Sequence, residues 1–266
     1  MLLTINHTSR YDYDQPVNFA LQRLRLWPQN IAGQVVREWS VEVSGADREV
    51  SYVDGFGNKV ELFKHERSAD SIIVRAHGVV ETEDRAGVVG KSAGGPPLWI
   101  YERVTDLTKA GPHIRELAEG IRDEQADQLA LLHTLMNTIH SRVVYSPGTT
   151  SVATEAEVAL DNGAGVCQDH SHIFLSAARL LGIPSRYVSG YLRMEGVTDQ
   201  TASHAWAEAY VDSLGWVGFD AANNICPNHN YVRIAVGLDY RSAAPVSGVR
   251  MGAAVETLDV HISVEQ

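Results

Sequence analysis

A tight turn followed by a long helix, residues 163–181, constrains the fold more than any other part of this sequence. Two glycines in its first three positions allow the backbone to turn sharply, and small and apolar residues then recur at helical spacing. Gly182 and Pro184 follow and stop the helix. Cys167 therefore lies in the first turn, where free backbone N–H groups and the helix dipole favour a thiolate, so this cysteine is a candidate nucleophile.

A strand further along the chain supplies a candidate base. Residues 203–211 alternate strictly, which predicts a strand that carries His204 and Trp206 on one face. The next strand returns antiparallel after a short turn and ends in Asp220, an acid that could orient an imidazole. In chain order, Cys167 thus precedes a base and an acid.

The distance between base and acid depends on the register of these two strands. A three-residue hairpin loop that ends in Gly215 places Asp220 opposite Glu208, roughly 13 Å along the strand from His204. The same register brings Asn223, or the asparagine after it, opposite His204. An amide can also orient an imidazole, so Asn223 is the alternative to Asp220.

Three motifs in this order and spacing resemble the core motifs of the transglutaminase-like superfamily, whose catalytic domain has a papain-like cysteine fold. They are Gly-Val-Cys-Gln-Asp at 165–169, Ser-His-Ala-Trp at 203–206 and Gly-Trp-Val-Gly-Phe-Asp at 215–220. The resemblance implies that Cys167 is the nucleophile, His204 the base and Asp220 the orienting acid. Members of the family commonly follow the acid with Pro-Thr, whereas Ala221 and Ala222 stand here.

Both ends of the chain extend the resemblance to the bacterial members. Residues 7–13 resemble their N-terminal β domain, and residues 235–241 resemble their C-terminal segment. Short alternating runs over the first ninety residues, with a hairpin signature at 54–58, independently predict an antiparallel β-sandwich-like domain. Helical spacing begins after Pro112, and strands return after Pro184.

These patterns predict an α+β chain in three parts. The first is the N-terminal antiparallel β-sandwich-like domain, residues 1–92. The second is the papain-like, transglutaminase-like catalytic core, residues 98–240, made of a helical part and an antiparallel sheet. A C-terminal loop and strand, residues 241–266, are expected to pack back on the chain.

Several shorter segments carry local predictions. Thr154–Glu157 matches the capping box that starts a short helix. The polar loop 194–201 directly precedes His204 and is expected to border a substrate cleft, whereas 243–252 is predicted to be a loop. The segment 90–97 has the composition of a linker, and its Gly-Lys-Ser lacks the earlier glycine that a phosphate-binding loop requires.

The predicted triad supports acyl transfer at amide bonds. His204 would keep Cys167 ionised, and the thiolate would attack an amide carbonyl with the Cys167 N–H as one oxyanion donor. Attack of water on the acyl-enzyme gives a peptide or isopeptide hydrolase, which the resemblance to bacterial members favours. Attack of an amine gives a protein-glutamine acyltransferase that cross-links or incorporates amines, and loss of catalysis would leave an inactive peptide-binding module.

The expected partner is therefore a peptide or protein with an amide or isopeptide bond. The sequence patterns do not specify the oligomeric state of this chain. A formal net charge of -11, with no basic run interleaved with aromatics, argues against nucleic acid. No signal peptide and no membrane-spanning stretch are evident, which predicts a cytoplasmic protein without a membrane partner. Both cysteines, Cys167 and Cys226, are then expected to be free thiols.

No cofactor or metal is expected. Cys167, His170, His172 and His204 have the chemistry of a zinc set, but at about 100° per residue His172 points about 140° away from Cys167. His172 is predicted to form a hydrogen bond in the core instead. No run of acidic residues forms a calcium loop. Trp206 shares the face of His204, where it either contacts substrate in the cleft or packs in the core.

Overall fold

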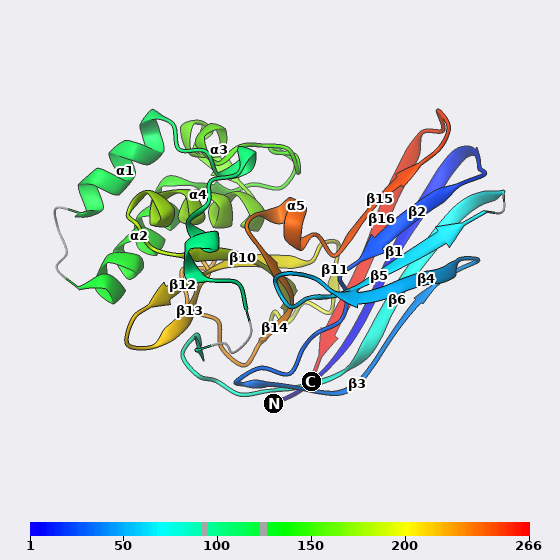
Figure 1. The fold of residues 1–266 in the computed structure, drawn as a ribbon, viewed down its shortest axis with the longest axis horizontal. Coiled ribbons are helices and arrows are strands. Elements are labelled where there is room, and N and C mark those ends of the chain that lie inside the picture. Colours follow the sequence, from blue (N-terminus) through cyan, green and yellow to red (C-terminus); the bar gives the residue numbers. More distant parts are fainter. Residues whose placement is uncertain (67, 92–94, 123–126) are drawn as a thin grey trace.

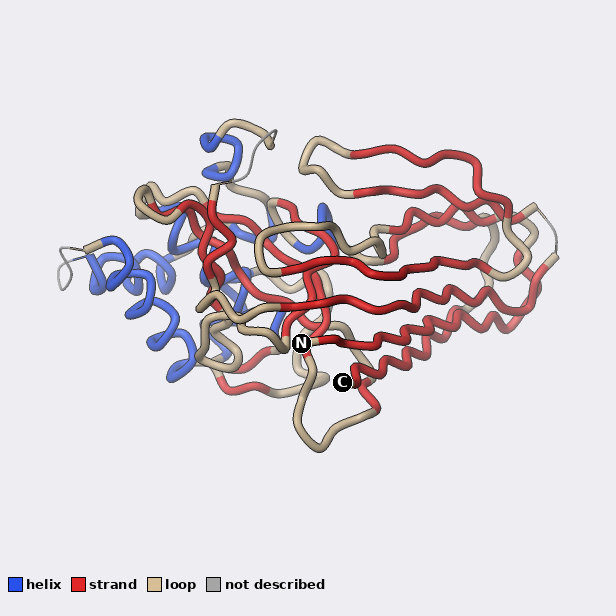
Figure 2. Tube along the Cα trace, turned by 90° about the horizontal axis from the view of Figure 1, so that it is seen from below, coloured by secondary structure: helices blue, strands red, loops and turns tan. Residues whose placement is uncertain are grey.

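A half rich in helices and a half made of long strands lie side by side (Figure 1 and Figure 2). This computed structural model describes residues 1–66, 68–91, 95–122 and 127–266, so residues 92–94 of the predicted linker lie outside the described residues. The two chain ends meet because the first and last strands pair antiparallel. Within the described ranges, no helix combines the length and the apolar character needed to cross a membrane.

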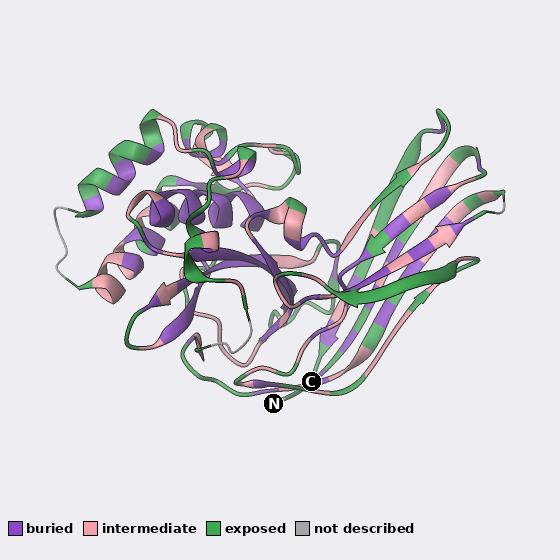
Figure 3. Ribbon diagram, in the orientation of Figure 1, coloured by how far each residue is buried: buried purple, intermediate pink, exposed green. Residues whose placement is uncertain are grey.

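The β half consists of two antiparallel sheets that pack face to face, as the alternating pattern predicts. Leu3 and Ile5 of the first strand point inward and share a hydrophobic cluster with Phe63 of the opposite sheet. One sheet has the order β11-β16-β1-β6-β3 and the other β15-β2-β5-β4. The strands of this half are β1 (Leu2–Val17), β2 (Ala20–Leu24), β3 (Gln34–Val43), β4 (Asp47–Val53), β5 (Lys59–His65), β6 (Ala69–Thr82), β11 (Asp199–Gln200), β15 (Val246–Arg250) and β16 (Glu256–Glu265). At one edge, β4 is exposed along its whole length (Figure 3).

The C-terminal region contributes two strands to this half. β15 pairs with β2, and β16 pairs with β1. The predicted loop over 243–252 is therefore wrong where Val246–Arg250 forms β15. None of the residues of this strand is buried. The strand therefore lacks the alternation of buried apolar and exposed polar residues by which a sequence pattern indicates a strand. It forms because the edge of β2 offers it backbone hydrogen-bond partners.

The other half places helices against a five-stranded antiparallel sheet (Figure 1). Ala205, Ala207 and Ala209 on one face of β12 share a hydrophobic cluster with α4, and their small side chains let this almost completely buried helix approach the sheet. The sheet order is β14-β10-β12-β13-β7. Its strands are β7 (Val88–Gly90), β10 (Ser185–Leu192), β12 (His204–Val211), β13 (Gly215–Phe219) and β14 (Tyr231–Gly237). Two 3-10 turns, the helices and a short parallel pair complete it: η1 (Leu98–Glu102), η2 (Asp106–Thr108), α1 (Pro112–Arg122), α2 (Gln128–Arg142), β8 (Val144–Tyr145), α3 (Ala156–Asn162), β9 (Ala164–Gly165), α4 (Cys167–Leu180) and α5 (Tyr240–Ala243). The core sheet thus includes β7, which comes from the range 1–92 assigned to the N-terminal domain.

The capping box predicted at Thr154–Glu157 is wrong. Glu155 is the N-cap residue of α3, and its side chain makes no capping hydrogen bond. Glu157 instead caps a different helix, because its carboxylate meets the unpaired N–H groups at the start of α1. These are the backbone N–H groups of Gly111 (2.9 Å), His113 (2.7 Å) and Ile114 (3.1 Å).

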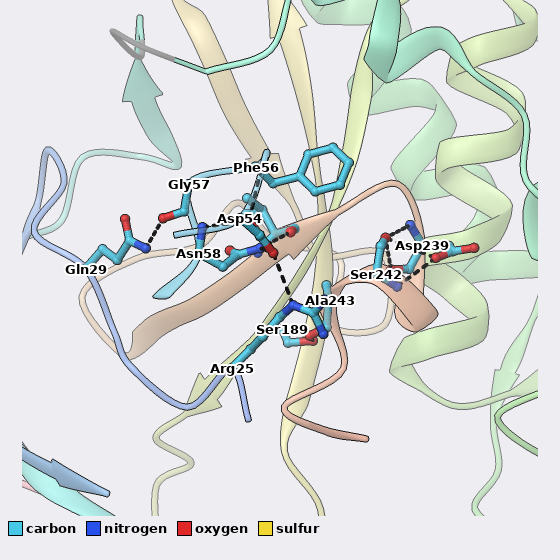
Figure 4. Close-up of polar contacts among 11 residues, drawn as sticks. Arg25, Gln29, Asp54, Phe56, Gly57, Asn58, Ser189, Asp239, Ser242 and Ala243 are labelled. Atoms are coloured by element: carbon cyan, nitrogen blue, oxygen red, sulfur yellow. Dashed lines mark hydrogen bonds and ion pairs between the residues drawn. The ribbon is translucent and has the colours of Figure 1, made fainter. Parts of the chain in front are cut away.

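The turn between β4 and β5 docks the β half onto the core sheet (Figure 4). In this turn, the buried side chain of Asn58 donates to the carbonyl of Val236 in β14 (2.7 Å) and accepts from its N–H (2.8 Å). Asp54 holds the turn by accepting the backbone N–H groups of Phe56 and Asn58, each at 3.0 Å, and it pairs with Arg25 at 3.2 Å. The amide of Asn58 therefore replaces a strand partner at this edge of the core.

A second buried contact between the halves is polar. His7 of β1 is hydrogen-bonded through Nδ1 to the hydroxyl of Tyr191 in β10 and through Nε2 to Ser9, each at 2.8 Å. Burial lowers the pKa of His7 to about 4. The ring is therefore neutral at pH 7, with one nitrogen donating and the other accepting.

Candidate active site

The predicted nucleophile lies at the first position of α4. Cys167 is a free thiol and is 8% exposed. The N–H of Val166, just before the helix, donates to Asp169 (2.7 Å), which also accepts the hydroxyl of Thr150 (2.7 Å). Gly165 is needed here because a Cβ would lie 2.7 Å from the Asp169 side chain. The thiol is thus fixed at a rigid helix end with free backbone N–H groups.

Two neighbouring strands bring the predicted base and acid together. His204 is the first residue of β12, and Asp220 follows directly after β13. Nε2 of His204 lies 2.6 Å from Oδ2 of Asp220. Because this nitrogen is occupied, Nδ1 is the ring nitrogen left for Cys167.

The strand register differs by two residues from the predicted one. The hairpin loop is 212–214, and Gly215 already belongs to β13. Gly215 has a φ of 79°, in the left-handed region that favours glycine. Phe219 pairs with Ala207, so the next residue, Asp220, falls level with Trp206, two residues closer to His204 than predicted. The remaining separation of roughly 7 Å along the strand is short enough for the two side chains to span.

Asp220 is fully buried and accepts five hydrogen bonds. Oδ1 accepts the backbone N–H groups of Ala222 (3.0 Å) and Asn223 (3.2 Å). Besides His204, Oδ2 accepts Nδ2 of Asn223 (2.8 Å) and the hydroxyl of Tyr231 (2.7 Å). Burial raises the pKa of this carboxyl, but the charge of His204 and the hydrogen bonds outweigh burial and lower the pKa below its ordinary value.

The imidazole of His204 favours its protonated form. Burial lowers its pKa, but the charge and hydrogen bond of Asp220, together with a hydrogen bond to Cys167, raise the pKa to about 10. Asn223 lies 3.4 Å from Nε2 of His204 through its own Nδ2. The structure therefore brings Cys167, His204 and both candidate orienting residues into one group.

Two aromatic rings support the imidazole. Trp206 stacks on His204 with ring centroids 6.2 Å apart, and Tyr231 meets Trp206 edge-on at 5.4 Å. Trp206 is 3% exposed and is not among the described residues that line the neighbouring cleft. Its contact with a substrate stays a prediction, whereas its direct contact with the imidazole restricts movement of the base.

A cleft of about 490 Å³ opens beside His204. The loop between β10 and β12 forms much of its wall, including Met194, Val197 and Asp199. Tyr145 of β8 also lines the cleft. The polar loop that precedes the predicted base therefore borders the cleft, at the place where a substrate could approach the imidazole.

The histidines of α4 are occupied by structural contacts. His170 lies 2.9 Å from the carbonyl of Val166 through Nδ1 and 3.0 Å from that of Val143 through Nε2. Nε2 of His172 accepts the N–H of Tyr240 (3.1 Å), and burial lowers the pKa of His172 to about 3. Across the described part of the chain, no group of three or more His, Cys, Asp or Glu side chains is arranged to hold a metal.

Two tyrosines near the triad were missed by the sequence reasoning. Tyr231 begins β14 and reaches Asp220 only because β14 folds back beside β10. Tyr145 lies close enough that burial and then the charges of Cys167 and Asp220 raise its pKa. Both tyrosines stand in short apolar runs, which are as typical of core strands as of a functional site. Their sequence context therefore contained no specific signal for a place near Cys167 and Asp220.

Two family models match this chain. Residues 115–221 match the core of the transglutaminase-like superfamily, and residues 3–81 match the bacterial transglutaminase-like N-terminal region. The first range contains Cys167, His204 and Asp220. The second covers β1 to β5 and most of β6.

Individual relatives match this chain over different lengths. An uncharacterised protein of Mycobacterium leprae is 29% identical over 275 residues, which cover 98% of this chain and 98% of that protein. A protein-glutamine gamma-glutamyltransferase of Pseudomonas aeruginosa is 28% identical over 157 residues, 52% of this chain and 23% of that protein. A solved structure from Cytophaga hutchinsonii, provisionally described as a cysteine protease, has a TM-score of 0.78 at 21% identity and covers 100% of this chain and 90% of its own. The last comparison shows a shared fold.

Proposed function

Because this chain belongs to the transglutaminase-like superfamily, with the N-terminal region of its bacterial members, we propose that it is a cysteine-dependent acyl-transfer enzyme acting on amide bonds. The proposed catalytic group is Cys167, His204 and Asp220. The observation that carries the proposal is the 2.6 Å contact of His204 with Asp220, together with the hydrogen bond to Cys167, at the start of α4, that helps to raise the pKa of His204. An imidazolium beside a thiol at a helix start stabilises the thiolate.

The proposed reaction begins with attack of the Cys167 thiolate on the carbonyl carbon of an amide. The backbone N–H of Cys167 donates to the resulting oxyanion. His204 gives its proton to the leaving amine as the C–N bond breaks, which leaves a thioester on Cys167. Asp220 holds the imidazole ring and its tautomer while His204 gives this proton to the amine and, later, takes one from the acceptor of the acyl group.

Water is the proposed acceptor of the acyl group, which makes the protein a peptide or isopeptide hydrolase. Among the described residues that line the cleft, Tyr145 is the one aromatic side chain besides His204, and it is 52% exposed. A wall with so few aromatic side chains leaves water free to reach the imidazole of His204, which supports hydrolysis. Water deprotonated by His204 then attacks the thioester, releases the acid and regenerates the thiolate.

An amine is the second candidate acceptor, which would make the protein a protein-glutamine acyltransferase. The 28% identity to the gamma-glutamyltransferase of Pseudomonas aeruginosa favours this function. A lysine amine would attack the same thioester, so the two functions differ only in the second half of the reaction. Mass spectrometry of glutamine peptides incubated with and without a primary amine separates them, because hydrolysis and amine incorporation give different masses.

The activated thiolate is tested by iodoacetamide labelling as a function of pH. We expect Cys167 to react well below pH 7, and His204→Ala to slow its labelling at pH 6 by about tenfold or more. Cys226 is the internal control, because burial raises its pKa to about 11. Labelling of Cys167 that starts only near about pH 8.5, or is unchanged in the variant, would contradict the proposal.

The proposed partner is a peptide or protein that carries the amide or isopeptide bond, and the proposed location is the cytoplasm. Both cysteines are free thiols, a state that a reducing compartment preserves. The net charge of -11 disfavours nucleic acid as a partner. Cell fractionation followed by detection of the protein tests the location.

A further inference from the structure

The cleft beside His204 exposes several large apolar side chains. Met194 is 41%, Val197 42% and Tyr145 52% exposed, and all three line the cleft. Leu192, which is buried, lines it as well. Apolar side chains that gather at the mouth of a concave site are typical of a surface that binds another molecule.

Asp199 adds a negative charge to this apolar cleft. It is the one carboxylate among the described residues that line the cleft, and no described lysine or arginine lines it. None of the ion pairs between described residues includes Asp199. An unpaired carboxylate at the wall of an apolar cleft attracts a cation and repels an acid. The net charge of the whole chain acts in the same direction.

The segment that carries Asp199 is tied down on two sides. As part of β11, Asp199 pairs with Ser263 of β16, so the C-terminal strand supports this wall. The next residue, Gln200, is buried and its Nε2 donates to the carbonyl of Leu192 (2.8 Å). The backbone of Asp199 is therefore held beside the apolar wall, while its exposed side chain is accessible to a ligand.

We propose that this cleft binds a peptide segment that carries an apolar side chain together with a lysine or arginine side chain, and that Asp199 selects the cationic residue. The apolar side chain of the peptide packs on Met194, Val197 and Tyr145, and the cationic group lies over Asp199. The inference rests on the proposed function, since it names the substrate class of the same site.

Binding to the full chain with Cys167→Ala tests the inference without turnover. The probes are fluorescent peptides with a central glutamine and a leucine, in matched sets that carry lysine, norleucine or glutamate at one flanking position, scanned along the peptide. Norleucine keeps most of the lysine stem and removes its charge. We expect at least one lysine peptide to bind roughly two- to fivefold more tightly than its norleucine partner, the range for a solvated ion pair, and the glutamate peptide to bind more weakly still.

Charge variants in the same background locate the effect. We expect Asp199→Asn to abolish the preference for lysine and Asp199→Lys to reverse it in favour of glutamate. Glu195→Gln is the matched control, because Glu195 is exposed in the same loop and is not among the described lining residues. Its preference should be unchanged.

The results separate this inference from the proposed function. Equal binding of the three peptides at every position, or a lysine preference that survives Asp199→Asn, would overturn the inference. If Cys167 also labels as an activated thiolate in the wild type, the proposed function stands and the substrate class alone is wrong. If the lysine preference is present but Cys167 behaves as an ordinary thiol, the cleft binds such peptides and the proposed catalysis is wrong.

Discussion

The proposed orienting acid, Asp220, contacts His204 through a single oxygen. Oδ2 of Asp220 accepts hydrogen bonds from His204, Asn223 and Tyr231, so the two candidate orienting residues act together on one imidazole. They differ in charge, since the carboxylate stabilises an imidazolium and a neutral amide does so much less. The sequence motifs pointed to Asp220, and the observed register explains why it reaches His204 directly.

The Asp220→Asn substitution removes the charge that raises the pKa of His204 and leaves the burial that lowers it. We expect the pKa of His204 to fall from about 10 towards its ordinary value of about 6.5, with Cys167 as the remaining contact that raises it, measured by NMR titration of the imidazole. Asn223→Ala keeps the carboxylate, so its His204 should still titrate above the ordinary value. The opposite ranking of the two variants would make Asn223 the main orienting residue.

The same substitution has a signed effect on stability. The pKa of His204 is raised in the folded protein, so protonated His204 paired with Asp220 stabilises the fold. This contribution to the free energy of unfolding is complete below about pH 6.5 and is lost as pH rises through about 10. The difference in free energy of unfolding between wild type and Asp220→Asn should therefore be largest near pH 6 and shrink towards pH 10. Denaturant titrations at the two pH values measure it, and a difference that grows with pH would contradict the assignment.

At the scale of elements, α1 depends on a carboxylate that lies 44 positions away from His113 in the chain. Glu157 of α3 satisfies three backbone N–H groups at the start of α1, so the two helices fix each other. The local pattern suggested that Glu157 caps its own helix. The N–H groups at a helix start can be satisfied by an acceptor from any part of the chain. Sequence spacing cannot show that the carboxylate of Glu157 lies beside α1 in the folded protein.

We expect Glu157→Ala to lower the free energy of unfolding by about 2 kcal/mol, at the upper end of the range for a lost helix cap, because it leaves three N–H groups without this acceptor. Thermal or denaturant unfolding measures the change. Glu155→Ala is the matched control, since this exposed side chain makes no capping hydrogen bond, and it should change stability by less than about 0.5 kcal/mol. Equal losses in the two variants would show that Glu157 does not cap α1.

At the scale of the whole molecule, buried polar contacts hold the two halves together. Asn58 pairs with Val236, and His7 pairs with Tyr191, so each half supplies a partner that the other half needs. The cleft also depends on both halves, because the strand that carries Asp199 pairs with β16. Docking of the β half is therefore coupled to the shape of the candidate active site.

Acid should weaken this docking through His7. Because its folded pKa is about 4, the unfolded chain binds more protons below about pH 6.5, and stability is lost as pH falls from there. Between pH 7 and pH 4.5 the wild type should lose about 2 kcal/mol more of its free energy of unfolding than His7→Gln. Denaturant unfolding of both proteins at the two pH values measures this, and parallel losses would exclude His7 as the cause.

The sequence by itself determined the elements and the residue types of the candidate site. Helical spacing, a strict alternation and glycine turns predicted α4, β12 and the β half, because these signals depend on neighbours within one or two turns of the chain. Only the tertiary structure decided the register that brings Asp220 to His204, the approach of Tyr231, the strand β15 and the wall that carries Asp199. Three of these depend on contacts between segments far apart in the chain, and the fourth on how a hairpin loop places its glycine. Such contacts form where packing brings an unsatisfied hydrogen-bonding group of one segment next to another segment. The local periodicity of either segment does not indicate them.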